Sequence, residues 1–253
     1  MDGMLVGQEA TPEAARVLRG ARRVVAFTGA GVSAESGVPT FRGTGGLWEG
    51  HRVEQVATPE AFAADPLLVW RFYEQRRINL HRCRPNPAHE VLARWQERFS
   101  SFVLTTQNVD GLHEDAGSRE VLHLHGSIWR VRCLVCGAER EDRTAPFPSL
   151  PPRCSCGGLL RPAVVWFGEA LPIEVLETSM TACERCDVLL VVGTSAVVYP
   201  AAGLVEVAAW AGATVIEVNP QPSALASLAQ VALRGPAGVL LPQLEAALAA
   251  EGG

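Results

Sequence analysis

The chain has 253 residues, of which 48% are hydrophobic and 19% are charged, and its formal net charge is −5. This balance is that of a folded globular protein and excludes a disordered chain. The negative charge gives no support to nucleic-acid binding. No apolar run reaches the roughly 18 residues of a membrane span, and the start of the chain lacks the pattern of a secretory signal. We therefore expect a cytoplasmic protein without nucleic-acid or membrane partners. We also expect a monomer, although composition does not bear on the oligomeric state.

Short apolar runs alternate with helix-like stretches along most of the chain. Strands are predicted at residues 23–28, 101–105, 121–125, 163–167, 187–192, 214–218 and 231–233. Helices are predicted at residues 11–20, 59–84, 87–98, 173–183, 201–211 and 237–250, with a glycine-rich loop at 42–52. Strands that alternate with helices indicate an α/β fold with a doubly wound parallel sheet.

A glycine-rich turn, Gly29-x-Gly31-x-x-Ala34, follows the first of these strands. Its spacing fits a dinucleotide-binding turn, in which glycines let the backbone approach a pyrophosphate and the following helix attracts it. No strand ends in Asp or Glu about 20 residues later, where such sites usually bind a ribose. Gly193-Thr194-Ser195 and Asn219, just past the ends of two other strands, are the candidate ribose partners. Taken alone, Ser195 and Asn219 are better explained as ordinary turn residues.

Four of the seven cysteines form two close pairs, Cys133-x-x-Cys136 and Cys154-x-Cys156. Thiolates from two tight turns suit tetrahedral Zn²⁺, and in a reducing compartment this pattern favours metal over disulfides. Four cysteine ligands leave no open coordination position, so we expect a structural zinc ion. Helical periodicity is lost between residues 131 and 160, which indicates a small module held together by the metal. A further pair, Cys183-x-x-Cys186, has no second pair beside it and is interpreted as structural thiols.

Polar residues gather between the predicted strand at 101–105 and the first cysteine pair. Gln107, Asn108 and Asp110 follow the strand, and His125 precedes Gly126. A histidine near its ordinary pKa of about 6.5 can act as a base at neutral pH. Considered by itself, each histidine has the alternative of a plain surface or core residue.

Together and in this order, these motifs resemble those of the sirtuin family, the NAD-dependent protein lysine deacylases. The matching segments span about residues 23 to 240. They are Gly29 to Ser33, Pro39 to Arg42, Gln107 to Asp110, His125-Gly126, the four cysteines, Val165 to Glu169, Gly193 to Ser195, and Asn219. The shortened second cysteine pair is the visible departure from the family pattern, and it bears on the metal geometry.

The resemblance implies a Rossmann-like large domain formed by residues 1–43, 85–126 and 162–253. It also implies a small domain made of a helical insertion, residues 44–84, and a zinc-binding module, residues 127–161. NAD and an acylated lysine of a protein substrate are expected to bind in the cleft between the two domains.

The resemblance further implies which residues bind NAD. They are Gly29, Ala30, Gly31, Ser33, Ala34, Glu35, Pro39, Thr40, Phe41, Arg42, Trp48, Gln107, Asn108, Val109, Asp110, Gly193, Thr194, Ser195, Asn219, Pro220, Gln221 and Ala237. Ala30, Asn108 and Asp110 match the nicotinamide pocket, where an amide and a carboxylate can hydrogen-bond a carboxamide. The expected catalytic residues are His125, Asn108 and Asp110, with His125 as the base for a ribose hydroxyl. His123 is interpreted as a supporting or packing residue, and His113 as a residue of a helix surface.

In the family, the substrate backbone pairs with an edge segment by strand addition. The matching residues are Val165, Trp166, Phe167, Gly168 and Glu169, and Tyr199 is also assigned to the substrate site. Trp166 and Phe167 are expected to line the lysine tunnel. The alternative for this apolar run is a core strand.

The spacing of Tyr73-x-x-Arg76 places both residues on one face of a predicted helix. In the sirtuin subgroup that removes succinyl, malonyl and glutaryl groups, such a pair binds the distal carboxylate of the acyl group. A small residue at the position of Ala57 leaves room for the longer chain. A guanidinium binds a carboxylate bidentately, and a phenol adds a donor. The alternative is an ordinary amphipathic helix, since arginine is common in this stretch.

We therefore expect an NAD-dependent protein lysine deacylase that removes succinyl and malonyl groups, with glutaryl as a further candidate and weaker deacetylation. Its products would be nicotinamide and O-acyl-ADP-ribose. Three alternatives stay open, namely a protein that is mainly a deacetylase, a mono-ADP-ribosyltransferase, and a non-catalytic protein that binds NAD or ADP-ribose.

Overall fold

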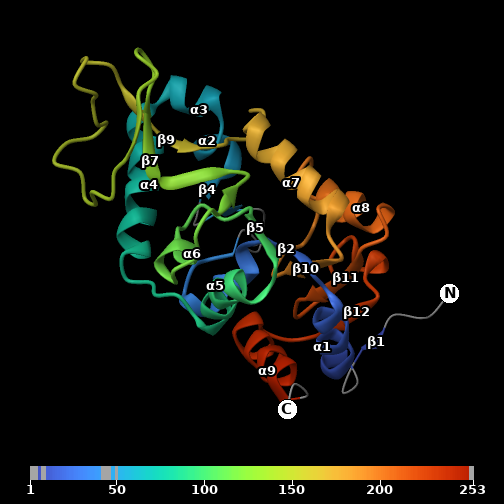
Figure 1. Ribbon diagram of the computed structural model, residues 1–253. Helices are drawn as coiled ribbons and strands as arrows, with labels where there is room; N and C mark the ends of the chain where they lie inside the picture. The colour runs from blue at the N-terminus through green and yellow to red at the C-terminus, as the bar shows by residue number, and fades with distance from the viewer. Residues whose placement is uncertain (1–4, 7–9, 41–46, 49–50, 251–253) are drawn as a thin grey trace.

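The computed structural model describes residues 5–6, 10–40, 47–48 and 51–250. Within them, seven strands form one parallel sheet in the order β1-β12-β11-β10-β2-β5-β6 (Figure 1). The strands are β1 (Leu5–Val6), β2 (Arg23–Thr28), β5 (Ser101–Thr106), β6 (Leu122–His123), β10 (Val188–Val192), β11 (Thr214–Val218) and β12 (Val231–Leu233). The predicted doubly wound parallel sheet is confirmed.

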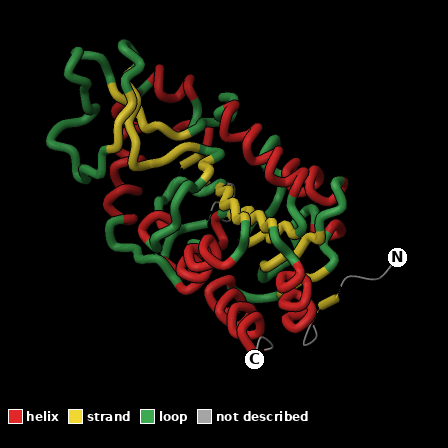
Figure 2. Tube along the Cα trace, in the orientation of Figure 1, coloured by secondary structure: helices red, strands yellow, loops and turns green. Residues whose placement is uncertain are grey.

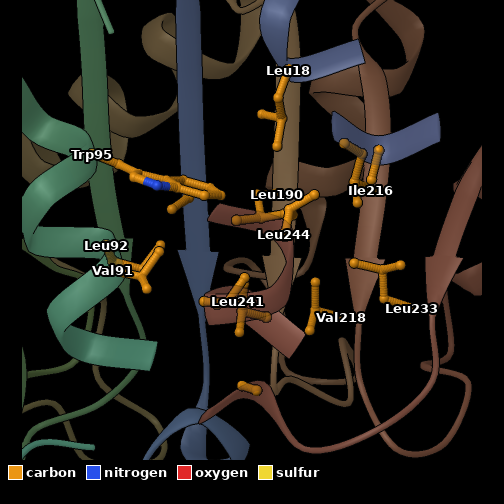
Figure 3. Packing of buried hydrophobic residues seen from close by; sticks show 14 of the residues in the cluster. Leu18, Val91, Leu92, Trp95, Leu190, Ile216, Val218, Leu233, Leu241 and Leu244 are labelled. Carbon is orange, nitrogen blue, oxygen red and sulfur yellow. The ribbon is translucent and has the colours of Figure 1, made fainter. Parts of the chain in front are cut away.

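Helices cover both faces of this sheet, because its central strands are apolar on both sides. Along β10, Leu190 packs toward one face and Leu189 toward the other, as the strand pleat requires. Figure 3 shows the first face, where Leu190 lies near Leu244 and Trp95. That face is covered by α1 (Ala10–Gly20), α5 (Pro87–Arg98) and α9 (Ala237–Ala250), and the other by α7 (Ile173–Arg185) and α8 (Gly203–Trp210).

A smaller unit with its own core stands beside the sheet (Figure 2). Its three antiparallel strands are β8 (Glu139–Glu141), β7 (Gly126–Cys133) and β9 (Leu160–Val164), with β7 in the middle. The helices α2 (Val53–Val56), α3 (Pro59–Ala64) and α4 (Pro66–Leu80) contribute to the same core. Trp70 of α4 is fully buried there, and its indole Nε1 donates to the Leu160 carbonyl at 2.7 Å.

The single helix predicted at residues 59–84 is wrong, because two helices occupy this stretch. Asp65 separates them, and its Oδ1 accepts a hydrogen bond from the Leu68 amide at 2.9 Å. Thr58 caps the first helix in the same way, by accepting from the Ala61 amide. An Asp before Pro66 combines a good helix cap with a position that disfavours helical backbone. The break was therefore readable from the sequence.

The strand predicted at 163–167 is also misplaced. The observed strand is β9, which pairs antiparallel with β7 and lies outside the parallel sheet. The other predicted elements are present, with ends within two residues of the prediction. In the segment predicted as a loop, β3 (Leu47–Trp48) pairs with β4 (His51–Arg52). Among the described helices, none is long and apolar enough to span a membrane.

Candidate active site

The glycine-rich turn after β2 lies against the turn after β10. The Gly31 amide donates to the Gly193 carbonyl at 2.7 Å. A Cβ on Gly31 would lie 2.7 Å from that oxygen, and a Cβ on Gly193, whose φ is +61°, would lie 2.3 Å from the Val32 nitrogen. Both positions need glycine because the two backbones touch. The turn leads into two short 3-10 helices, η1 (Ala30–Val32) and η2 (Ala34–Ser36), so the α-helix expected to attract a pyrophosphate is not formed there.

Side chains from the ends of three strands meet at Thr194. Gln107, after β5, donates from Nε2 to the Thr194 hydroxyl at 2.8 Å, and Asn219, after β11, donates from Nδ2 to the Thr194 carbonyl at 2.9 Å. The Ser195 carbonyl accepts from the Ala224 amide at 2.9 Å. These predicted residues thus share the carboxyl-terminal edge of the sheet, where open α/β sheets bind ligands.

A buried polar group joins the two segments that follow β2 and β5. The Asn108 Nδ2 donates to both the Gly29 carbonyl and the Ser33 hydroxyl at 3.1 Å. Ser33 donates in turn to the Asp110 carboxylate at 2.8 Å. Asp110 is 6% exposed, and burial raises its pKa although hydrogen bonds from Leu112 and Ser33 oppose the shift. The sequence-predicted Asn108 and Asp110 therefore lie together beside the glycine-rich turn.

Two buried histidines extend this group. His89 Nε2 lies 3.2 Å from the Ser33 hydroxyl, and His113 Nε2 lies 2.9 Å from the Thr28 hydroxyl. Burial lowers the pKa of both rings, that of His89 to about 4. The prediction that His113 lies on a helix surface is wrong, since it is 1% exposed. The sequence did not single out His89 as a site residue. Its position next to Ala88, on the helix whose buried residues also include Val91, Leu92 and Trp95, was the signal that it is buried.

His125 lies in the short connection between β6 and β7. Its Nδ1 is 3.0 Å from the Gln107 carbonyl, which can only accept, so Nδ1 carries the proton and Nε2 keeps its lone pair. Burial lowers the pKa of His125, and the Gln107 carbonyl opposes this. Burial would also lower the pKa of His123, but its hydrogen bond and ion pair with Glu114 raise it overall. The pKa of His125 is therefore lowered, whereas the pKa of the nearby His123 is raised.

The predicted substrate segment runs between His125 and Ala57. The Val165 amide donates to the His125 carbonyl at 2.9 Å, and the Phe167 amide donates to the Ala57 carbonyl at 3.0 Å. Phe167 is 46% exposed. Tyr199 is exposed and donates to Glu206 at 3.0 Å.

The predicted acyl-selecting residues lie in the apolar core of the smaller unit. Tyr73, Arg76 and Ala57 are 1%, 8% and 2% exposed. The guanidinium carbon of Arg76 lies 5.9 Å from the centre of the Tyr73 ring. Burial raises the pKa of Tyr73 to about 12, so the phenol stays protonated and can donate at physiological pH. Burial raises the pKa of Asp110 overall, and the positive charge of Arg76 is among the smaller influences that oppose this rise.

The four predicted metal ligands come together at one end of β7. Their sulfur atoms all lie within 4.8 Å of one another, with Cys133–Cys156 at 3.5 Å and Cys136–Cys154 at 3.8 Å. A tetrahedral zinc ion with Zn–S bonds of about 2.3 Å separates its ligands by about 3.8 Å. The four thiols therefore fit zinc despite the shortened second pair. Cys183 and Cys186 are buried elsewhere, where the Cys186 thiol donates to the Cys183 carbonyl.

The remaining residues assigned to NAD are less informative. Those described and exposed are Ala34, Glu35, Pro39, Thr40, Pro220 and Gln221. The Val109 carbonyl accepts from the Ile128 amide at 2.9 Å, and Ala237 begins α9, where Glu35 accepts from the Gly238 amide at 2.6 Å. Trp48 belongs to β3, while Phe41 and Arg42 lie outside the described residues.

A groove of about 720 Å³ lies away from all of these residues, between α7 and the start of β2 and β5. Its lining includes Arg23, Ser101, Glu174 and Arg185, and none of the predicted site residues. This groove is therefore separate from the candidate active site.

Comparisons with known proteins show the family of this chain. The model of the Sir2 family matches residues 29–200. NAD-dependent protein deacylase 2 of Pyrobaculum aerophilum is 53% identical over 231 residues, which cover 91% of this chain and 92% of the relative. The crystal structure of a Sir2 homologue in complex with NAD is 45% identical, with a TM-score of 0.87 over 98% of this chain and 96% of that one. A Sir2 protein bound to a myristoylated histone peptide is 35% identical, with a TM-score of 0.77 over 96% and 97% of the two chains. The chain therefore belongs to the Sir2 family, and its sequence similarity to NAD-dependent protein deacylases extends over nearly its whole length.

Proposed function

We propose that this NAD-dependent protein deacylase removes acyl groups that end in a carboxylate, succinyl and malonyl above all and glutaryl as a further candidate, from protein lysines. Acetyl-lysine would be a weaker substrate. The observation that carries the proposal is the buried pair of Tyr73 and Arg76 on one helix of the smaller unit, whose apolar core also includes Ala57.

The physical argument concerns the cost of burying a cation. A guanidinium that is 8% exposed loses most of its hydration, and a bidentate carboxylate is the ligand that best offsets that loss. Tyr73 adds a hydroxyl donor on the same helix face, three residues away. An acetyl group offers no charge to either residue. The pair therefore favours acyl chains with a distal carboxylate.

The remaining site residues would serve the reaction with NAD, which is consumed as a co-substrate. Asn108 and Asp110 would bind the nicotinamide carboxamide, and the substrate's acyl oxygen would attack the ribose carbon as the bond to nicotinamide breaks. His125 would then accept the proton of a ribose hydroxyl at Nε2, the ring nitrogen left with a lone pair. Four thiolates would hold zinc in a closed coordination shell, and its role would be to stabilise the module.

Lysine peptides that differ only in the acyl group provide the test. Acetyl, malonyl, succinyl and glutaryl peptides are incubated with and without NAD, and nicotinamide and deacylated peptide are quantified. Wild-type enzyme should prefer succinyl and malonyl peptides, with turnover that requires NAD. A preference for acetyl peptide would contradict the proposal.

Replacing the cation tests the same proposal at one residue. Arg76→Met should lower kcat/KM for succinyl peptide roughly 30-fold or more relative to acetyl peptide, since losing a buried charged partner costs about 2 kcal/mol or more. Arg71→Met is the matched control, because Arg71 lies on the same helix but is exposed. An equal loss toward both peptides in Arg76→Met would sink the assignment.

A further inference from the structure

The Tyr73 hydroxyl makes one hydrogen bond within the described part of the chain, and in it the oxygen is the acceptor. The indole Nε1 of Trp166 donates to this oxygen at 2.9 Å. Among the residues that the structure describes, the hydroxyl proton therefore has no acceptor, although Tyr73 is 1% exposed. A buried donor left without an acceptor is costly, which points to a ligand that supplies one.

Trp166 is itself held in place from several sides. The guanidinium carbon of Arg161 lies 3.5 Å from the centre of its ring, and the Phe62 ring centre lies 5.2 Å away. Arg161 binds both carboxylate oxygens of Glu169 at 2.5 and 2.9 Å, and Glu169 also accepts from the Trp166 amide at 2.8 Å. These contacts fix the direction in which the indole N–H points.

A phenol O–H lies near the plane of its ring and has two orientations. The Trp166 N–H occupies one side of the Tyr73 oxygen, so a hydroxyl proton on that side would meet another donor. The proton must therefore point to the other side. Arg76, on the same face of α4, offers only donors and cannot accept this proton. The Tyr73 hydroxyl and the Arg76 guanidinium, whose carbon lies 5.9 Å from the Tyr73 ring centre, are both donors, and an anionic acceptor suits such a pair.

We propose that Trp166 is a positioning residue for acyl selection, which directs the Tyr73 hydroxyl proton toward the distal carboxylate of the bound acyl chain. This inference rests on the proposed function. Turnover of acyl-lysines that end in a carboxylate should depend on Trp166 in this way. Turnover of acetyl-lysine should not.

Trp166→Phe removes the indole N–H and keeps an aromatic ring. We expect the KM for succinyl peptide to rise roughly three- to tenfold relative to that for acetyl peptide, the range of a single hydrogen bond, with the kcat ratio nearly unchanged. Trp70→Phe is the matched control, because Trp70 is buried in the same core and its indole donates to the Leu160 carbonyl. That variant should leave the succinyl-to-acetyl ratio at the wild-type value. A change of equal size in both variants would overturn the proposal.

Combining substitutions separates this inference from the proposed function. In a Tyr73→Phe background, adding Trp166→Phe should not change the acyl preference further, because the hydroxyl that Trp166 directs is gone. If Tyr73→Phe lowers the succinyl preference but Trp166→Phe does not, the inference alone fails. If Tyr73→Phe leaves the preference unchanged, the proposed function fails with it. Should Trp166→Phe not fold, 3-benzothienylalanine at position 166 keeps the ring shape without the N–H and gives the same readout.

Discussion

At the scale of single residues, the proton on His125 is fixed by its backbone partner. The Gln107 carbonyl holds a proton on Nδ1, which leaves Nε2 as the basic nitrogen. A backbone carbonyl supplies this orientation without adding a charge next to the base. The burial of the ring then decides at which pH that nitrogen is available.

The pH dependence of the reaction follows from the direction of this shift. Burial lowers the pKa of His125 from 6.5, so the neutral, basic form persists to lower pH than in an ordinary histidine. The value of kcat/KM for NAD should be flat near neutral pH and fall as the pH drops, with the midpoint below 6.5. His125→Gln should lose most activity, whereas His81→Gln, at an exposed histidine, should keep the wild-type profile. A midpoint above 6.5 would argue against His125 as the base.

Residues of the site could be predicted from the sequence where a motif surrounds them. They could not be predicted where only packing brings them to the site. Asn108, Asp110 and Ser33 were assigned from ordered motifs, and Ser33 hydrogen-bonds to each of the other two. His89 and His113 carry no motif. Their role in the buried group depends on which helix faces meet, and a single sequence does not specify that before the fold is known.

At the scale of elements, two turns from distant parts of the chain touch through their backbones. The turn after β2 and the turn after β10 follow strands that pair directly, so their closeness is set by the sheet. The sequence predicted both turns but not their contact, which depends on the order of the strands. The break between α3 and α4 is different, since its capping residues and prolines were sufficient to predict it from the sequence.

The contact between these turns can be tested with an added methyl group. Gly193→Ala should lower the melting temperature and weaken NAD binding, because Gly193 has φ +61° and its Cβ would lie 2.3 Å from the Val32 nitrogen. Gly212→Ala is the matched control, since Gly212 has φ +90° but nothing within 4 Å of its Cβ position. The control shows the cost of the backbone conformation alone, about 1 kcal/mol. Equal losses in the two variants would mean that the contact has no effect of its own.

At the scale of the whole molecule, the two larger sheets that the structure describes have different surroundings. The parallel sheet is covered by helices on both faces, whereas the three-stranded sheet has helices on one side and the cysteine cluster at its end. The composition change at residues 131–160 predicted this separate module. It did not predict that β9 belongs to it, because an apolar run has no feature that distinguishes a parallel from an antiparallel partner.

Zinc removal should therefore affect the two cores differently. Metal analysis should give one zinc ion per chain, and chelation should loosen the smaller unit, seen as a change in tryptophan fluorescence, while most helical circular dichroism remains. Cys136→Ser should reproduce the chelated state, and Cys83→Ser, which lies outside the cluster, should retain the metal. A single unfolding transition at the same temperature with and without metal would contradict this expectation.

Asp110 has a consequence for how loss-of-function alleles are interpreted. One carboxylate oxygen binds Ser33, the other binds the Leu112 amide, and its carbonyl accepts from the Trp129 indole at 2.6 Å. An Asp110→Ala allele would remove both carboxylate hydrogen bonds at once. Loss of activity in that allele could then come from a disturbed structure as well as from a missing chemical group. Asp110→Asn keeps the shape and one acceptor oxygen while removing the charge. A genetic screen that scores only null phenotypes would merge these two causes, and the asparagine allele is the one that tells them apart.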